Sequence, residues 1–177
     1  AKARPEQITY ATTGIGSDDH LFVLHFEELA GLKPMIQVPF AGAAPLIPQL
    51  LGGNMDVAAI NVNDAIQLAR EGKVRMLAQA AATRQPEAAD VPTFRELGFD
   101  LVHGASRGIV GPPNMPPAIV ARLEAAFRTA LSDENFKREA ARQFMPLNTM
   151  VGAEYRAFAQ RVDDRLKQLW QVRPWRG

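Results

Sequence analysis

Short β-favouring segments alternate with helical patterns through the first eighty residues, and this alternation is the strongest constraint on the fold. Strands are predicted over residues 8–11, 35–38, 56–60 and 74–80. Helices are predicted over residues 18–30, 43–51 and 63–71, each ended by a following glycine. Strands that alternate with helices pair in parallel through right-handed crossovers. The predicted fold class is therefore α/β.

The second half of the chain is mainly helical. A loop over 82–92, a short helix over 93–97 and an extended stretch lead to the prolines between 112 and 117, which prevent regular structure. Three amphipathic helices are predicted beyond them, the first with an inward apolar face that includes Ile119 and Leu123. Only residues 101–110 and 145–148 remain as candidate strands, too little sheet for three helices. We expect the missing strands to come from a segment upstream or from a second copy of the chain.

Composition excludes several classes of protein. Twenty Lys and Arg against nineteen Asp and Glu give a formal net charge of +1, which offers no field for nucleic acid or an anionic membrane. The absence of cysteine excludes disulfides, thiolate catalysis and cysteine-type zinc sites. No apolar run approaches the ~20 residues that span a bilayer. The first residue is not Met and no signal-peptide core follows it, so we expect that a preceding stretch was removed.

The sharpest local feature is the loop Thr12–Ser17, which precedes the first predicted helix. Gly14 and Gly16 let main-chain N–H groups approach a ligand, the hydroxyls add donors, and the helix dipole favours negative charge. A carboxylate or a phosphate fits such a loop. The alternative is equally well supported: Ser17 simply caps the helix and the glycines only make the turn.

Two further loops leave the corresponding ends of the next two strands, over residues 40–43 and 61–63. Open α/β sheets bind ligands at the carboxyl ends of their strands, so the three loops are expected to converge. Asn63 is better explained as the cap of its helix. Asn61 is the better candidate for a ligand contact, because its amide offers both a donor and an acceptor.

No arrangement of residues supports catalysis, a metal site or a cofactor. The sequence lacks a Gly-x-Ser-x-Gly elbow and a Ser-x-x-Lys motif. His20 and His25 are five residues apart, which places them on different helix faces and fails the spacing of a helical metal site. His20 is either a ligand donor or a surface or internally satisfied histidine. Asp18 and Asp19 are expected to be surface charges that favour the helix dipole.

Six strings follow one another in a specific order along nearly the whole chain. They are YATTGIGS with His20, then VPFAGAAP, LLGGNMDV, EGKVR, DVPTFRELG and RGIVGPP. Each string is weak alone, but their order and spacing are specific. Together they resemble the Bug family, the periplasmic solute-binding proteins of tripartite tricarboxylate transporters.

The resemblance implies two α/β lobes of the periplasmic-binding-protein kind that close on a small organic carboxylate. Residues 1–105 resemble the complete second lobe, and residues 106–177 resemble the returning, mainly helical part of the first lobe, whose opening part is absent. The resemblance also implies a periplasmic location, membrane transporter subunits as partners and no enzymatic activity. The ligand-binding residues that it implies are Thr12, Thr13, Gly16, Ser17, His20, Ala41, Gly42 and Asn61.

The sequence departs from the resemblance at Asp18 and Asp19, where relatives often carry a small residue and a His. Two carboxylates in the first helical turn weaken the potential felt by an anion unless both point to solvent. Ile60, where many relatives carry Asp, argues against a site for an ammonium group. Two functions stay open: capture of a carboxylate for a transporter, or a remnant binding-protein domain that pairs as a homo-oligomer with weak or no ligand binding.

Overall fold

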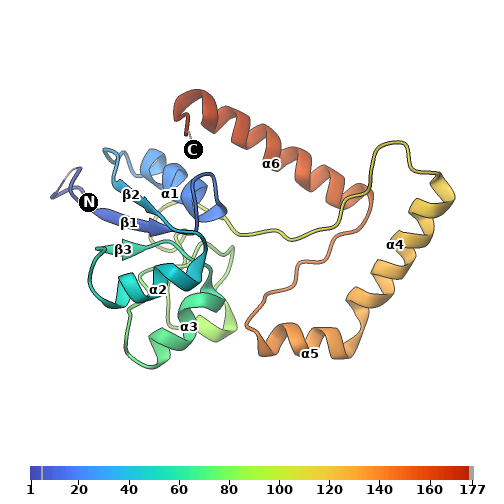
Figure 1. Ribbon diagram of the computed structural model, residues 1–177, viewed down its shortest axis with the longest axis horizontal. Helices are drawn as coiled ribbons and strands as arrows, with labels where there is room; N and C mark the ends of the chain where they lie inside the picture. Colours follow the sequence, from blue (N-terminus) through green and yellow to red (C-terminus); the bar gives the residue numbers. More distant parts are fainter. Residues whose placement is uncertain (5, 176–177) are drawn as a thin grey trace. The chain divides into compact units, whose positions relative to one another are not determined.

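The computed structural model describes residues 1–4 and 6–175 (Figure 1). The chain forms two compact units. The first, here called the sheet unit, comprises Ala1–Ala105 and the C-terminal segment that begins at Arg173. The second, the helical unit, comprises Ser106–Val172. The C-terminal segment therefore belongs with residues far from it in the sequence.

A three-stranded parallel sheet in the order β2–β1–β3 forms the sheet unit's framework. The strands are β1 (Thr9–Thr12), β2 (Ile36–Pro39) and β3 (Val57–Ala58). The last three residues of β1 are buried, because this strand has a neighbour on each side. The predicted α/β alternation with parallel strands is confirmed.

Three helices alternate with these strands, close to the predicted positions. They are α1 (Asp18–Leu29), α2 (Ala43–Leu51) and α3 (Val62–Arg70). Ser17 caps α1, since its Oγ accepts from the main-chain N of His20 at 3.3 Å. Helix α1 packs on the sheet through Val23, which lies in a buried cluster with Tyr10 and Ala59.

The fourth predicted strand, over residues 74–80, is not formed. The segment makes one parallel bridge, between Gln79 and Thr93. Leu77 is 57% exposed, because no strand within the described residues lies alongside to complete the pairing. Short apolar runs of this kind indicate a strand only where a neighbour exists to accept its hydrogen bonds.

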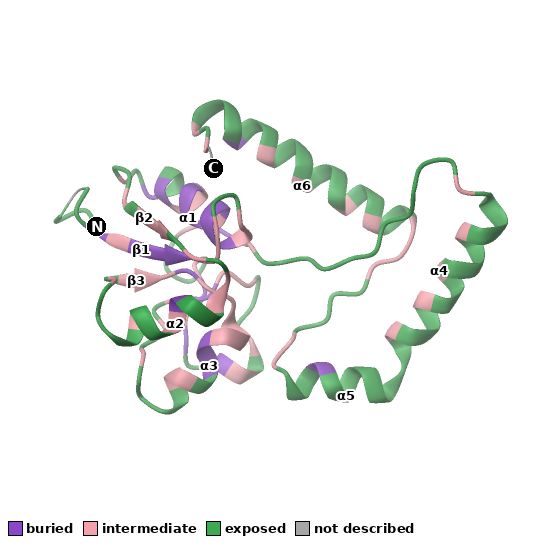
Figure 2. Ribbon diagram, viewed as in Figure 1, coloured by how far each residue is buried: buried purple, intermediate pink, exposed green. Residues whose placement is uncertain are grey.

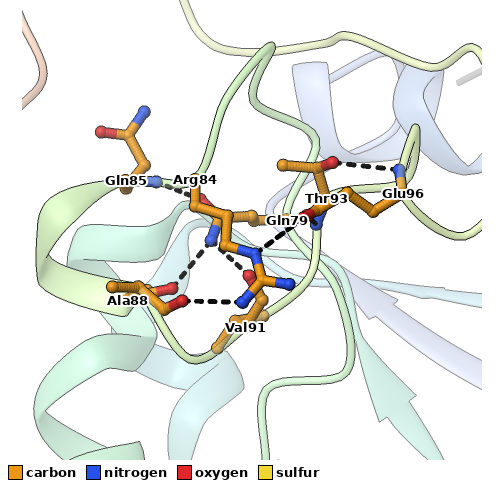
Figure 3. Close-up of polar contacts among 8 residues, drawn as sticks. Gln79, Arg84, Gln85, Ala88, Val91, Thr93 and Glu96 are labelled. Atoms are coloured by element: carbon orange, nitrogen blue, oxygen red, sulfur yellow. Dashed lines mark hydrogen bonds and ion pairs between the residues drawn. The ribbon is translucent and has the colours of Figure 1, made fainter.

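Gln79 instead organises the loop that follows (Figure 3). Its side chain is 2% exposed. Its Nε2 donates to the carbonyl oxygens of Ala88 at 2.9 Å and Val91 at 2.8 Å. Its Oε1 accepts from the main-chain N of Gln85 at 2.8 Å. One buried amide thus holds both ends of the 3₁₀ turn η1 (Pro86–Ala88).

The short helix predicted over 93–97 is a single turn. Thr93 and Glu96 form a reciprocal capping pair, in which Thr93 N donates to Glu96 Oε2 at 2.7 Å and Glu96 N donates to Thr93 Oγ1 at 3.2 Å (Figure 3). Gly98 then takes a φ of 89° and ends the turn. The capping pair starts the turn, but the left-handed glycine follows too soon for a helix.

This turn places aromatic rings against α1. The ring of Phe94 lies 5.2 Å from those of Phe22 and Phe26, and Phe99 lies 5.3 Å from Phe26. Such edge-to-face pairs add about 0.5–1.5 kcal/mol each beyond the area they bury. The Gln79 loop therefore helps to fix the helix whose first turn carries the candidate site.

The helical unit contains α4 (Pro117–Ser132), α5 (Glu134–Arg142) and α6 (Ala153–Val172). These helices were predicted, but the face of α4 expected to point inward is not covered: Ile119 is 49% and Leu123 is 44% exposed, and no residue of α4 is buried. The candidate strands over 101–110 and 145–148 are not formed. Figure 2 shows the contrast, with buried residues gathered on β1 and α1 and almost none on α4 and α6.

Candidate ligand site at the start of helix α1

Three loops meet at the carboxyl edge of the sheet, as the strand order requires. Strand β1 lies between β2 and β3, so the loop after β1 has the other two beside it. Phe40, after β2, donates its main-chain N–H to the carbonyl of Thr12 at 2.9 Å. Asn61, after β3, donates from Nδ2 to Asp18 Oδ2 at 3.4 Å. The predicted convergence of the loops is therefore present.

Thr12 is the last residue of β1, directly before the loop, and it is fully buried. Its Oγ1 accepts from Gln37 Nε2 at 2.9 Å and donates to the carbonyl of Gly14 at 3.3 Å. The Thr12 hydroxyl is therefore bonded to the neighbouring strand β2 through Gln37 and to its own loop through Gly14. These two bonds stabilise the loop.

Thr13 has a resident acceptor. Asp19 Oδ2 lies 2.5 Å from Thr13 Oγ1 and 3.3 Å from Thr13 N. Asp19 is 6% exposed, so the expectation that it is a surface charge is wrong. Position 19 lies in the first turn of α1, and the side chain reaches back over the loop to the two donors of Thr13.

Burial raises the pKa of Asp19 to about 6, against the lowering effect of its bonds to Thr13. The carboxylates of Asp18 and Asp64 raise it further. Three acidic side chains therefore influence one end of the site. A bound anion meets repulsion there, as expected unless both Asp18 and Asp19 point to solvent, because Asp19 is buried.

The Gly16 amide also has a partner within the chain. Gly16 N donates to His20 Nδ1 at 3.0 Å. Burial, and then the positive charge of Arg173, lowers the pKa of His20. A neutral ring whose Nδ1 accepts from the main chain carries its proton on Nε2. Of the alternatives for His20, the structure shows an internally satisfied histidine, whose remaining donor is the Nε2–H.

Ser17 is occupied as a cap. Its Oγ donates to the carbonyl of Gly14 at 2.8 Å and accepts from His20 N. Of the two interpretations of the loop, capping is thus present. The donors left at the helix start are the main-chain N–H groups of Asp18 and Asp19, which have no acceptor among the described residues.

The other two loops present their residues differently. Ala41 is exposed, and Gly42, with a φ of 98°, begins α2 without a side-chain cap. Nothing lies within 4 Å of where a Cβ on Gly42 would be, so this main chain is open to a ligand. Asn61, not Asn63, is the N-cap residue of α3, which corrects the prediction. The Asn61 side chain makes no capping bond and turns instead to Asp18.

The C-terminal segment was not foreseen as a neighbour of this loop. Trp175 packs on Gly16, with its indole Nε1 3.4 Å from where a Cβ on that residue would lie. Arg173 forms an ion pair with Glu27, which is 1% exposed and also accepts from Met35 N at 2.6 Å. Arg173 and Glu27 are 146 residues apart, and no local pattern in the sequence links them.

The arrangement can bind but offers little for chemistry. The loop carries hydroxyls, amides and carboxylates, and its imidazole is committed to a main-chain amide. No group of three or more His, Asp and Glu residues in the described part of the chain could hold a metal ion. No helix among the described residues has the length and apolar character needed to cross a membrane.

A family model described as "Tripartite tricarboxylate transporter family receptor" matches residues 1–174. The chain is 31% identical to the UPF0065 protein in the gbd 5' region of Cupriavidus necator over 162 residues, which is 90% of this chain and 48% of that protein. It therefore spans about half the length of this relative.

Solved structures agree with this match. A TctC solute-binding protein from Polaromonas, without ligand, has 28% identity and a TM-score of 0.77 over 94% of this chain and 57% of its own. MatC from Rhodopseudomonas palustris, with bound malate, has 29% identity and a TM-score of 0.69 over 93% of this chain and 56% of its own. The α/β fold is thus that of solute-binding proteins of this kind.

Proposed function

The chain belongs to the family of tripartite tricarboxylate transporter receptors, as the resemblance to Bug proteins predicted, and from this membership we propose that it binds a small organic carboxylate for delivery to membrane transporter subunits. The family's members are solute-binding proteins, so we propose binding without catalysis. We further propose a periplasmic location. The sheet unit then corresponds to the family's second lobe and the helical unit to the returning part of the first.

The observation that carries the proposal is the meeting of three loops around free main-chain donors. The N–H groups of Asp18 and Asp19 stand at the positive end of the α1 dipole. Asn61 and the open main chain at Gly42 lie on the two flanking loops. A carboxylate placed here receives charge-assisted hydrogen bonds of the stronger kind.

The predicted ligand residues fall into two sets: those whose hydrogen-bond donors are mostly bonded within the chain, and those that can still contact a ligand. Thr12, Thr13, Gly16, Ser17 and His20 all lie in or beside the first loop, but the bonds described above engage most of their donors. We propose that these residues shape the loop, and that Asn61, Ala41 and Gly42, with the N–H groups that open α1, make the ligand contacts.

The test is a calorimetric titration of the full 177-residue chain with malate, adipate, citrate and, as a phosphate ester, glycerol 3-phosphate. Saturable heat from one of the carboxylates is the expected result. Heat from the phosphate ester alone, or no heat from any of them, would contradict the proposal.

A matched pair of variants localises the binding. Asn61→Ala removes a side chain that borders the site, and we expect about threefold to tenfold weaker binding. Asn54→Ala removes an exposed amide that bonds only to Gln49, at 2.8 Å, and should leave the affinity unchanged. Equal losses in both variants would place the ligand elsewhere.

A second candidate function, self-association, is favoured by the exposed apolar face of α4. We propose that Ile119 and Leu123 then contact a second copy of the chain, making the protein a homo-oligomer. Sedimentation velocity should show a dimer that Leu123→Lys converts to a monomer. A monomer at all concentrations would exclude this alternative.

A further inference from the structure

We propose that Asp19 determines which acids the site accepts, because its own carboxylate occupies the donors of Thr13 in the way that a ligand's carboxylate would. This inference rests on the proposed function and specifies its ligand class. The favoured ligand has one carboxylate at this lobe and a neutral hydrogen-bonding group, such as an amide, beside Thr13. A second carboxylate at that position is excluded.

The geometry indicates that the Asp19 carboxylate occupies both hydrogen-bond donors of Thr13 and is not in chance contact with them. One oxygen of Asp19, Oδ2, receives both the hydroxyl at 2.5 Å and the main-chain N–H at 3.3 Å. The side chain is 6% exposed. A hydroxyl and a main-chain N–H directed at the same oxygen are the pair of donors that a bound carboxylate needs. The protein therefore supplies its own acceptor at this position.

An incoming carboxylate cannot share these donors. Two anionic oxygens on one pair of donors repel one another, and the carboxylates of Asp18 and Asp64 act on the same region. A carboxamide has no charge to be repelled, and its N–H groups can donate to a resident carboxylate. Discrimination then comes from repulsion of the wrong ligand as much as from attraction of the right one.

Asp18 provides an internal control for this role. It lies on the same helical turn with the same charge, but its Oδ2 accepts from Asn61 Nδ2 at 3.4 Å, whereas the hydroxyl and main-chain N–H of Thr13 donate to Asp19. Removing either carboxylate takes away one negative charge. Only the removal of Asp19 vacates the donors of Thr13.

The experiment compares succinate with succinamate, which differ only in a carboxylate against a carboxamide. Binding to the full chain is followed by calorimetry and by the ¹⁵N–¹H signal of Thr13. The wild-type chain should prefer succinamate by about tenfold, the size of one charge-assisted hydrogen bond. Asp19→Ala should remove this preference, with succinate shifting the Thr13 signal.

Two further variants separate charge from occupancy. Asp19→Asn keeps an oxygen on Thr13 without the charge, so the Thr13 signal should not respond to succinate. Asp18→Ala should change the preference by less than threefold. An equal change in Asp18→Ala and Asp19→Ala would reduce the effect to net charge and overturn the proposal. A wild-type Thr13 signal that succinate shifts as it does in Asp19→Ala would also overturn it.

The experiment distinguishes failure of the proposed function from failure of the role proposed for Asp19. If malate, adipate, citrate, succinate and succinamate all fail to bind the wild-type chain, the proposed function fails. A gain of succinate binding at Thr13 in Asp19→Ala then still supports the role of Asp19, whereas no gain overturns it. If Asp19→Ala does not fold, the wild-type chain supplies the test. Its Thr13 amide should titrate together with the Asp19 carboxyl carbon, and independent titration would overturn the proposal.

Discussion

Both units of the chain contain helices of nine residues or more, but the two units differ in how far their side chains are buried. In the sheet unit, residues such as Leu46 and Leu101 are fully buried. In the helical unit, Ala140 and Leu169 are the only buried residues among those described. The difference teaches that helices form from local signals, such as the Asp133 cap of α5, whether or not a core is available to cover them.

Ion pairs show the same contrast. In the sheet unit, Glu27 is buried and its carboxylate depends on Arg173 and the main chain. In the helical unit, the pair between Asp163 and Lys167 is spaced i, i+4 and lies in solvent. We therefore expect an ion pair to stabilise the folded state strongly in the sheet unit and only slightly in the helical unit.

The largest expected effect is the loss of Arg173. Arg173→Ala leaves the buried Glu27 carboxylate without its cationic partner, and we expect the free energy of unfolding of the sheet unit to fall by about 3–5 kcal/mol. Denaturant unfolding measures this, with Trp175 as the fluorophore in a Trp170→Phe background. Lys167→Ala, which breaks an exposed pair, is the control and should not move the midpoint. Similar midpoints for both variants would contradict the contrast between the units.

The next largest effect compares two leucines. Leu101→Ala removes a fully buried side chain from the sheet unit, and we expect a loss of about 3 kcal/mol. Leu123→Ala acts on a 44% exposed side chain of α4, and we expect less than about 0.5 kcal/mol. Circular dichroism during urea unfolding measures both. A large loss in Leu123→Ala would show that α4 is covered in solution, and self-association would then be the first cause to examine.

The sequence predicted most of the sheet unit because its signals are local. Small-residue loops, caps and glycine stops placed all three βα units of the sheet. The segment over 74–80 failed because pairing depends on a neighbour, which no local pattern reports. The helix predicted over 93–97 failed for a different reason, since Thr93 caps its start and Gly98 ends it after one turn.

The sequence predicted where the candidate site lies, but not which of its hydrogen-bond donors are already bonded within the chain. Strand order alone brings the loops of Gly14, Phe40 and Asn61 to one edge. Whether a donor is free depends on side-chain direction, and the reach of Asp19 back to Thr13 is not encoded in the spacing of acidic residues. The contact of Trp175 with Gly16 joins opposite ends of the chain and has no local signal either.

A smaller effect tests the buried amide of Gln79. Gln79→Ala leaves the carbonyls of Ala88 and Val91 and the N–H of Gln85 without their partner, and we expect a loss of about 2 kcal/mol. Hydrogen exchange at Gln85 and neighbouring amides should accelerate before the rest of the sheet unit does. Gln67→Ala, which removes an exposed amide of α3, is the control, and comparable exchange in both variants would contradict the role of Gln79.

The smallest expected effect is the pH dependence that Asp19 adds to the sheet unit. Its pKa of about 6 in the folded chain lies above the ordinary value of 3.8, so the folded state holds this proton more tightly than the unfolded state does. The stabilisation is therefore fully present below about pH 4 and is lost as the pH rises through about 6. Asp18 on α1 and Asp64 on α3 are the charges that reinforce the shift.

Asp19→Asn abolishes this dependence because an amide does not titrate in the range. Between pH 4 and pH 7 the wild-type chain should lose about 1–2 kcal/mol relative to the variant, measured by urea unfolding with Trp175 as the fluorophore. The Trp170 signal of the helical unit, followed in a Trp175→Phe background, should show no such difference between the two chains. Since Asp19 bonds to Thr13 within the sheet unit, a parallel change in both signals would show that the units unfold together and that their differences in burial do not make them independent.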